Sequence, residues 1–123
     1  MADLPPAAVV LALTTEANAE LADALAQALL ERRLVACVSV LPVRSRYWWQ
    51  GRVEQSEEVQ LLLKTAASRL EALQLAVHQL HSYATPEWLV WTASASQGYG
   101  SWLAAELADQ PPVTGPDAGP AAP

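Results

Sequence analysis

Two long segments with β-strand character meet at Gln50 and Gly51. Residues 34–49 and 52–65 are rich in β-branched and alternating apolar residues, and the glycine between them suits a turn or bulge. At ~3.3 Å per residue, each strand of this hairpin spans roughly 45–50 Å, whereas a domain of this size has a radius of gyration of about 14 Å. The far half of the hairpin must therefore extend beyond its own domain.

Three aromatic residues, Tyr47, Trp48 and Trp49, stand directly before this turn. A two-stranded ribbon without further support is only marginally stable in water, and a cluster of exposed aromatic side chains is typical of a surface that binds another protein. We therefore predict an oligomer in which the hairpin tip contacts another subunit. The alternative is a bulge or break near Pro42 that folds the aromatic residues back onto the core of their own protomer.

The remaining segments alternate between strand and helix patterns. Apolar runs predict strands over 6–15 and 86–94, and a 3.6-residue period predicts helices over 16–33, 66–82 and 99–109. The order strand, helix, strand, strand, helix, strand is that of the split ferredoxin-like (βαββαβ) arrangement. We expect an α+β fold with an antiparallel sheet, helices on one face and an extra C-terminal helix.

Caps and buried stripes of these helices can also be predicted. The first helix is expected to start at Thr14 or Thr15 as its N-cap, with Glu16 at the positive end of its dipole. Arg32 and Arg33 are expected to oppose the negative C-terminal end. The stripes predicted to be buried are, in chain order, Leu21, Leu25, Ala28 and Leu29, then Leu70, Leu73, Val77 and Leu80, then Trp102, Leu103 and Leu107.

Composition limits the classes of partner. The chain has 123 residues and a net charge of -6, which argues against binding to nucleic acid or to an anionic membrane surface. With Cys37 as the only cysteine, no basic n-region and no apolar stretch of ~20 residues, we expect a cytoplasmic protein. Residues 1–109 are expected to form one domain, and the Pro/Gly/Ala-rich tail 110–123 to be disordered.

Several short motifs, taken in order, resemble the CutA divalent-ion tolerance family. They are "ACV" at 36–38, W-x-G-x-V-x-x-x-x-E from Trp49 to Glu58, "KT" at 64–65 and H-x-Y-x-x-P-E from His81 to Glu87. The resemblance covers nearly all of residues 8–107. It implies a ferredoxin-like protomer in a tight homotrimer whose hairpins pack across subunits, and a role in tolerance of copper and other divalent metals without catalysis.

The sequence departs from that family's pattern at three positions. Some members have a cysteine where this chain has Ala12, and some have two adjacent histidines where it has Leu80 and His81. The proline that often follows is Ser82 here. If the cysteine and the histidine pair hold the metal in those members, most of their site is missing from this chain.

His81 and Glu87 are the candidate ligands for copper or another divalent cation. Imidazole and carboxylate are both metal ligands, and threefold symmetry could bring copies of this pair together. The favoured alternative is that His81 simply ends the second helix, where a partly protonated ring suits the dipole. His78, three residues earlier, is expected to be solvated, and Cys37 to be a buried, inert thiol.

A set of residues is predicted to line an interface or cleft between subunits. Glu58 is expected to be half-buried and paired with Arg44, Arg46 or Lys64, which would fix the register of the hairpin. Tyr83 is expected to shape the loop into the fourth strand and could rim a pocket with Trp49 and His81. The full predicted set is Tyr47, Trp48, Trp49, Glu58, Lys64 and Tyr83.

Two functions remain in competition at this point. The first is a cytoplasmic CutA-like homotrimer that responds to divalent metal and is not an enzyme, with weak or interface-built metal binding. The second is a trimeric small-ligand sensor or scaffold, comparable in architecture to PII-type signalling proteins, that uses clefts between subunits. Metal binding that depends on His81 would favour the first, and saturable binding of a nucleotide or small anion without a metal response would favour the second.

Overall fold

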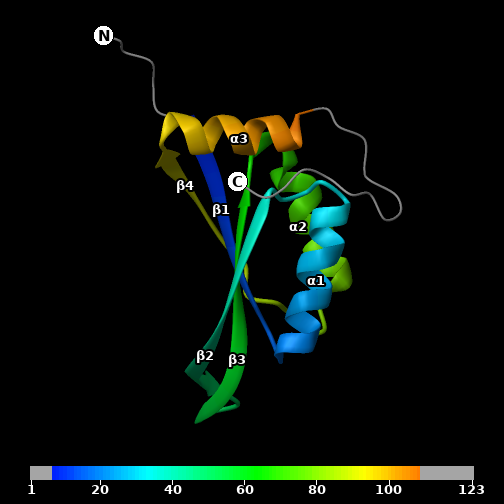
Figure 1. Cartoon of the computed structure of the whole chain (residues 1–123). Helices are drawn as coiled ribbons and strands as arrows, with labels where there is room; N and C mark the ends of the chain where they lie inside the picture. Colours follow the sequence, from blue (N-terminus) through cyan, green and yellow to red (C-terminus); the bar gives the residue numbers. More distant parts are fainter. Residues whose placement is uncertain (1–6, 109–123) are drawn as a thin grey trace.

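One antiparallel sheet organises the chain, which a computed structural model describes over residues 7–108. Its strands, in the spatial order β2-β3-β1-β4, are β1 (Ala7–Glu16), β2 (Cys37–Trp49), β3 (Arg52–Thr65) and β4 (Leu89–Ala95). The helices are α1 (Ala19–Glu31), α2 (Leu70–Leu80), which follows the short 3-10 turn η1 (Ala67–Arg69), and α3 (Gln97–Leu107) (Figure 1). The predicted α+β ferredoxin-like fold is confirmed, whereas the predicted tail at 110–123 lies outside the described residues.

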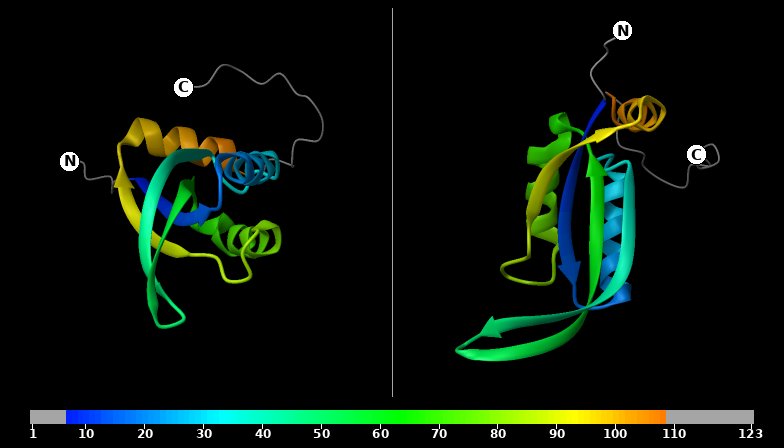
Figure 2. Two further views of the ribbon diagram at one scale, coloured as in Figure 1. Left: turned by 90° about the horizontal axis from the view of Figure 1, so that it is seen from below. Right: turned by 90° about the vertical axis from the view of Figure 1, so that its left-hand side faces the viewer.

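The main core lies between the sheet and helices α1 and α2. In Figure 2, right, both helices stand behind the sheet, so one face of the sheet is covered and the other faces the viewer. Alternation along β1 and β3 places Ala12, Leu61 and Leu63 on the covered face, where each is fully buried. They pack with Leu29 and Val77 of the two helices. This agrees with the alternating apolar pattern of the segment 52–65, whose second half alternates between buried and half-buried residues.

Helix α1 begins later than the sequence pattern predicts. Its N-cap is Asn18, whose side-chain oxygen accepts the Leu21 N–H at 2.8 Å. Thr14 and Thr15 are not caps, because β1 continues through Glu16, which pairs with Val59 of β3. Ladder hydrogen bonds and burial in the sheet therefore decide this boundary over the local capping preference.

The residues predicted to be buried on α1 and α2 are only partly correct. The alanines Ala22, Ala26 and Ala76 are buried against the sheet, whereas Leu21 and Leu80, which were predicted to be buried, are 37% and 39% exposed. Leu25, Leu29, Leu73 and Val77 are buried as predicted. A helix packed closely on a sheet can bury alanine at positions where a leucine would be too large, and the apolar period alone does not reveal this.

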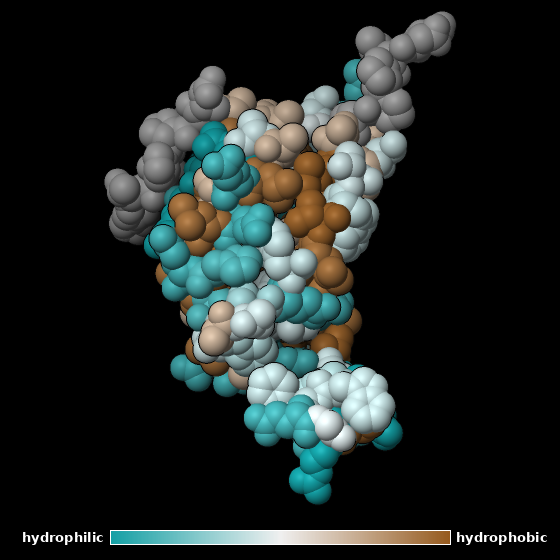
Figure 3. Space-filling model, turned by 180° about the vertical axis from the view of Figure 1, so that it is seen from behind, coloured by the Kyte–Doolittle hydropathy of each residue, from teal (hydrophilic) through white to brown (hydrophobic). Residues whose placement is uncertain are grey.

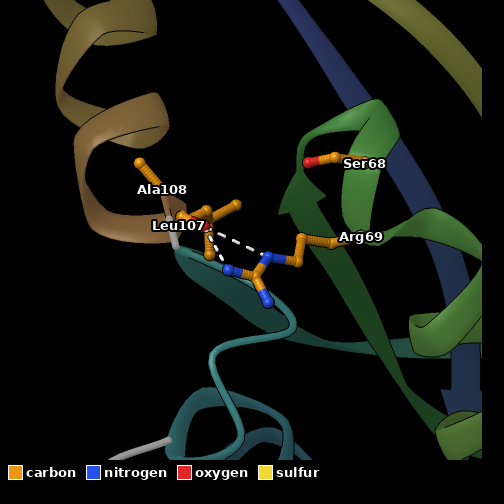
Figure 4. Close-up of a pocket in the computed structure, with 4 residues that line it drawn as sticks. All are labelled: Ser68, Arg69, Leu107 and Ala108. Atoms are coloured by element: carbon orange, nitrogen blue, oxygen red, sulfur yellow. Dashed lines mark hydrogen bonds between the residues drawn. The ribbon is translucent and has the colours of Figure 1, made fainter. Parts of the chain in front are cut away.

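Helix α3 packs on the opposite face of the sheet, at the end of the sheet where β1 begins. Its Leu103 and Leu107 are 1% and 3% exposed and contact Val9, as a second and smaller core. Two arginines from other elements bind the C-terminal carbonyls of this helix. Arg69 donates from both Nε and Nη2 to the Leu107 carbonyl (Figure 4), and Arg33 donates to the Glu106 carbonyl at 3.2 Å.

The role of Arg33 therefore differs from the prediction. Arg33 lies in the left-handed region, at φ 56°, where the chain turns from α1 into β2, and its guanidinium also pairs with the Glu106 carboxylate at 3.1 Å. It thus stabilises the C-terminus of α3, not that of α1. Arg32 is the C-cap of α1, and its backbone N–H donates to the carbonyls of Ala28 and Leu30.

The hairpin of β2 and β3 extends well beyond the body of the protomer (Figures 1 and 2). Gln50 and Gly51 both have positive φ, at 51° and 78°, as a two-residue primed turn requires. Pairing is continuous from Cys37 with Lys64 to Trp49 with Arg52. The alternative of a break near Pro42 is therefore wrong, and the predicted overhang is present in the protomer.

Large apolar side chains remain uncovered on the isolated protomer. Trp48 and Trp49 are 75% and 60% exposed at the hairpin tip, and Leu89 and Trp91 of β4 are 52% and 43% exposed. Seen from behind, apolar side chains form a band along the body, and pale aromatic rings stand at the hairpin end (Figure 3). Within residues 7–108, no helix is long and apolar enough to span a membrane.

Candidate functional site at the base of the hairpin

A buried polar cluster lies where β1 ends, close to the C-terminus of α2. His81 is the C-cap of α2 and only 9% exposed, and its Nε2 lies 2.6 Å from the Thr15 carbonyl oxygen. The Tyr83 backbone N–H donates to Nδ1 at 3.0 Å. Because a carbonyl can only accept and an N–H can only donate, these contacts define a neutral ring with its proton on Nε2. The predicted position at the end of the second helix is confirmed, but both ring nitrogens already have partners.

Glu16 holds the other side of this cluster and is 1% exposed. Its Oε1 accepts hydrogen bonds from the Ser82 hydroxyl and the Ala17 N–H, and its Oε2 accepts the Ser82 N–H at 3.0 Å. Burial by itself raises the pKa of this carboxyl, but the hydrogen bonds from Ser82 and Ala17 outweigh burial and leave the pKa below its ordinary value. Glu16 is therefore a charged anchor for the loop that follows α2.

Ser82 makes this anchor possible. It uses both its hydroxyl and its backbone N–H to bind the carboxylate of Glu16. A proline at position 82 could provide neither donor. Where relatives often have a proline, this chain has a serine that hydrogen-bonds to Glu16, which lies 66 residues earlier at the end of β1.

Tyr83 connects the loop to the hairpin. Its hydroxyl donates to Oε2 of Glu58 at 2.8 Å, and burial together with this carboxylate raises the pKa of Tyr83 to about 12. Glu58 is half-buried as predicted, but its predicted partner is wrong. Within residues 7–108, it pairs with the Tyr83 phenol and not with Arg44, Arg46 or Lys64.

Glu87, the other predicted metal ligand, reaches the same cluster from the outside. It is exposed, and its Oε1 accepts from the Thr15 hydroxyl at 3.4 Å, while the Thr15 carbonyl accepts from His81. The structure thus connects His81 and Glu87 through one threonine. Residues 7–108 contain no group of three or more His, Cys, Asp and Glu side chains placed to hold a metal ion. The assignment of His81 and Glu87 as metal ligands stays a prediction.

The other predicted interface residues lie elsewhere along the hairpin. Lys64 pairs with Cys37 at the body end of the ribbon, whereas Trp49 pairs with Arg52 at the tip. Cys37 is half-buried and lies 3.7 Å from the Lys64 ammonium, so the prediction that its thiol is buried is wrong, and its inertness stays a prediction. Tyr47, near the tip, shares a hydrogen bond with the hydroxyl of Ser56. His78 is exposed as predicted, and its ring makes a T-shaped contact with the Trp88 ring.

Sequence reasoning missed Glu16, Thr15 and Ser82 as members of the cluster. Glu16 follows an apolar strand and precedes a helix, so it looks like a first-turn acid. A signal was present, however, in "HSY" at 81–83, where three polar residues follow a helix without Gly or Pro. Such a segment needs hydrogen-bond partners for its polar groups, and a distant acid is a suitable one.

Comparisons with known proteins agree with this architecture. The family described as CutA1 divalent ion tolerance protein matches residues 10–106. The "Divalent-cation tolerance protein CutA" of Pectobacterium atrosepticum is 44% identical over 109 residues, which cover 87% of this chain and 99% of the relative. A solved structure of CutA from Synechococcus elongatus superposes with a TM-score of 0.82 at 40% identity, and covers 85% of this chain and 95% of its own.

A plant structure extends the likeness. CutA1 from Oryza sativa superposes with a TM-score of 0.79 at 30% identity, and covers 85% of this chain and 98% of its own. The protein is thus an α+β protein of ferredoxin-like fold with an extended hairpin. It belongs to the CutA divalent-cation tolerance family.

Proposed function

We propose that this protein is a cytoplasmic homotrimer that takes part in the response to divalent metal, with copper as the candidate ion, and that it does so without catalysing a reaction. The metal role is supported by the names of its relatives, which are divalent-cation tolerance proteins. The observation that carries the assembly is the overhanging hairpin, whose Trp48 and Trp49 are 75% and 60% exposed on the protomer. Aromatic side chains exposed to this extent are typical of residues that an interface covers.

The geometry of His81 limits how a metal can bind. A metal needs a free lone pair on a ring nitrogen, and Nδ1 accepts the Tyr83 N–H while Nε2 bears the proton donated to Thr15. Coordination through His81 thus requires the loop after α2 to move, or the Thr15 contact to break. This favours weak binding, in keeping with a site completed by symmetry-related copies and not within one protomer.

The test is native mass spectrometry with and without added copper. The wild type is expected to be a trimer that binds copper in multiples of three, and both His81→Ala and Glu87→Gln are expected to lose the bound metal. Since His81 is buried, Glu87→Gln is the cleaner variant, and His78→Ala, an exposed histidine on the same helix, is the matched control. A wild-type trimer that ignores copper would contradict the metal role, and a monomer would contradict the assembly.

A second candidate function, a trimeric small-ligand sensor comparable to PII proteins, is favoured by one observation. A cavity of about 290 Å³ opens between β1, β4 and α3, on the face of the sheet that α1 and α2 leave uncovered. Its volume lies just below the range of about 300–1,000 Å³ that is usual for small-molecule sites. Saturable binding of a small molecule in this cavity, without any response to metal, would favour this function over the first.

A further inference from the structure

The overhanging hairpin loses its support from β1 at one point of the sheet. β1 ends at Glu16, which pairs with Val59 of β3, and Glu58 is the next residue of β3 toward the tip. Between Glu58 and Arg52, β3 pairs with β2 alone. At ~3.3 Å per residue, this two-stranded part is roughly 23 Å long. Because such a ribbon is only marginally stable by itself, contacts at its base decide how it leaves the body.

The loop that follows α2 binds the sheet at this point. Ser82 donates from its hydroxyl and its backbone N–H to the carboxylate of Glu16. Tyr83 donates its phenol hydrogen to Oε2 of Glu58 at 2.8 Å. Since directly paired residues share a face and successive residues alternate, Glu16 lies on the face of Val59, and Glu58 lies on the opposite face. Two consecutive loop residues thus hold opposite faces of the sheet where β1 ends.

The hairpin bends at its base. Figure 2, right, shows that it does not continue the direction of the body strands but turns, near the end of β1, toward the side on which the loop between α2 and β4 lies. The bond from Tyr83 to Glu58 joins that loop to the hairpin on the inner side of the bend. Within residues 7–108, the Glu58 side chain makes no other hydrogen bond or ion pair. This single bond is therefore well placed to hold the bend.

Tyr83 is itself fixed by the buried cluster. Its backbone N–H donates to Nδ1 of His81 at 3.0 Å, and the centroids of the two rings are 4.9 Å apart. The His81 ring is held in turn by the Thr15 carbonyl. A hydrogen bond from a phenol to a carboxylate is charge-assisted and stronger than a bond between neutral groups. The contact with Glu58 is thus a strong bond made from a fixed position.

A second polar contact lies on the same face of the hairpin, closer to the tip. Alternation along β3 places Ser56 on the face of Glu58, and the register of the two strands places Tyr47 there as well. The hydroxyls of Tyr47 and Ser56 share a hydrogen bond. Trp49, two residues after Tyr47, has the same orientation. Polar contacts thus extend along this face from the loop toward the aromatic tip.

We propose that the loop of residues 81–83 is a brace that fixes the direction of the overhanging hairpin, with the Tyr83–Glu58 hydrogen bond holding the bend. This inference rests on the proposed homotrimer and adds that each protomer presents its hairpin to its neighbours in a preformed position. An element that is ordered before association avoids the cost of becoming ordered during it. The brace therefore raises the affinity between subunits from within one protomer. Because both partners belong to one chain, the brace does not require them to stay exposed in the assembly.

Hydrogen exchange measured by mass spectrometry tests whether the bond holds the hairpin. The variants of the full chain are Tyr83→Phe, which removes only the phenol hydroxyl, Glu58→Ala, and the two together. In each, the amides of 42–46 and 54–58 are expected to exchange faster than in the wild type, with α1 unchanged. Glu57→Gln, the exposed carboxylate next to Glu58 on β3, is the matched control and is expected to exchange as the wild type does.

Sedimentation velocity over a dilution series measures the consequence for assembly. Tyr83→Phe and Glu58→Ala are each expected to weaken the trimer about tenfold, because only a fraction of the separated protomers then holds the hairpin in the bound direction. The double variant is expected to be no weaker than the single variants, since all three lack the same bond.

Three results would overturn the inference. Unchanged exchange in Tyr83→Phe would show that the bond does not hold the hairpin. Additive losses of affinity in the double variant would show that the two side chains act through separate contacts, such as direct contacts with another subunit. Faster exchange with unchanged affinity would show that assembly does not depend on the direction of the hairpin. A wild type that is monomeric at every concentration would instead contradict the proposed assembly, and the exchange measurement would still decide whether the brace holds the hairpin.

Discussion

Single residues in this protein take their chemistry from partners far away in the sequence. His81 is neutral and occupied at both nitrogens because Thr15 and Tyr83 fix its ring, and Glu16 is charged although buried because residue 82 provides two donors. The sequence contains all of these residues, but it does not show that residues 16 and 82 touch. A histidine that looks like a ligand in the sequence is thus part of a hydrogen-bonded cluster in the fold.

Glu16 predicts a specific dependence of stability on pH. Its pKa in the folded protein lies below the ordinary value of 4.5, so its contribution is fully present above pH 4.5 and is lost as the pH falls through the folded pKa. Glu16→Gln removes the charge and is expected to lower the free energy of unfolding at neutral pH by about 2 kcal/mol. The measurement is urea unfolding from neutral to acidic pH.

The difference between wild type and Glu16→Gln should shrink as the pH falls, because the wild type loses the same charge-assisted bonds. Glu20→Gln, an exposed carboxylate in the first turn of α1, is the matched control and should change the free energy of unfolding by well under 1 kcal/mol. A constant difference between wild type and Glu16→Gln at every pH would contradict the assignment of Glu16 as the titrating group.

At the scale of elements, boundaries and packing are set jointly by local preference and tertiary contact. β1 extends through Thr14 and Thr15 because β3 pairs with it, and α1 then starts at Asn18. Helix α3 has no basic residue in its last turn, and the donors for its C-terminal carbonyls come from Arg33 and Arg69. Local patterns predicted that these elements exist, but the interactions that end them come from other elements.

Arg69 is therefore expected to hold α3 against the body. In Arg69→Met, the Leu107 carbonyl loses both of its donors, and α3 should be destabilised by about 1 kcal/mol. Hydrogen exchange measured by mass spectrometry should then show faster exchange in residues 99–107 than in the wild type, with α1 unchanged. Arg52→Met, at the exposed hairpin turn, is the control. Equal acceleration in all helices would mean that Arg69 supports the whole fold and not this docking.

At the scale of the molecule, the protomer exposes more apolar surface, at the hairpin tip and on β4, than a stable soluble monomer usually does. The exposed tryptophans at the tip and the uncovered apolar residues of β4 lie outside both cores. The body is a complete ferredoxin-like domain with α1 and α2 on one face (Figure 2). The extension of the hairpin beyond this body is what the proposed homotrimer explains.

Substitution of the two tryptophans at the hairpin tip distinguishes an effect on trimer assembly from an effect on the folding of the protomer. Trp48→Ala with Trp49→Ala should weaken the trimer at least about tenfold, because large aromatic side chains dominate interface energies. The stability of the separated protomer should change by less than about 0.5 kcal/mol, since both side chains are exposed there. Sedimentation velocity over a dilution series measures the first effect, and urea unfolding at low concentration measures the second.

Leu75→Ala is the control for this prediction, because it removes a side chain that is 62% exposed on α2, away from the hairpin. It should leave the assembly unchanged. A tip variant that remains trimeric at every concentration at which the wild type does would show that the aromatic residues do not hold the subunits together.

The sequence by itself determined the order of elements, the hairpin with its turn at Gln50 and Gly51, and the overhang, because these follow from local periodicity, turn conformation and residue length. Only the tertiary structure decided the partners of Glu16, Glu58 and His81, the start of α1, and the pairing of Lys64 with Ser39 and Cys37. These depend on contacts between residues 25 to 66 positions apart. A hydrogen bond is formed by two groups at short range, and one-dimensional spacing does not say which distant groups the fold brings that close.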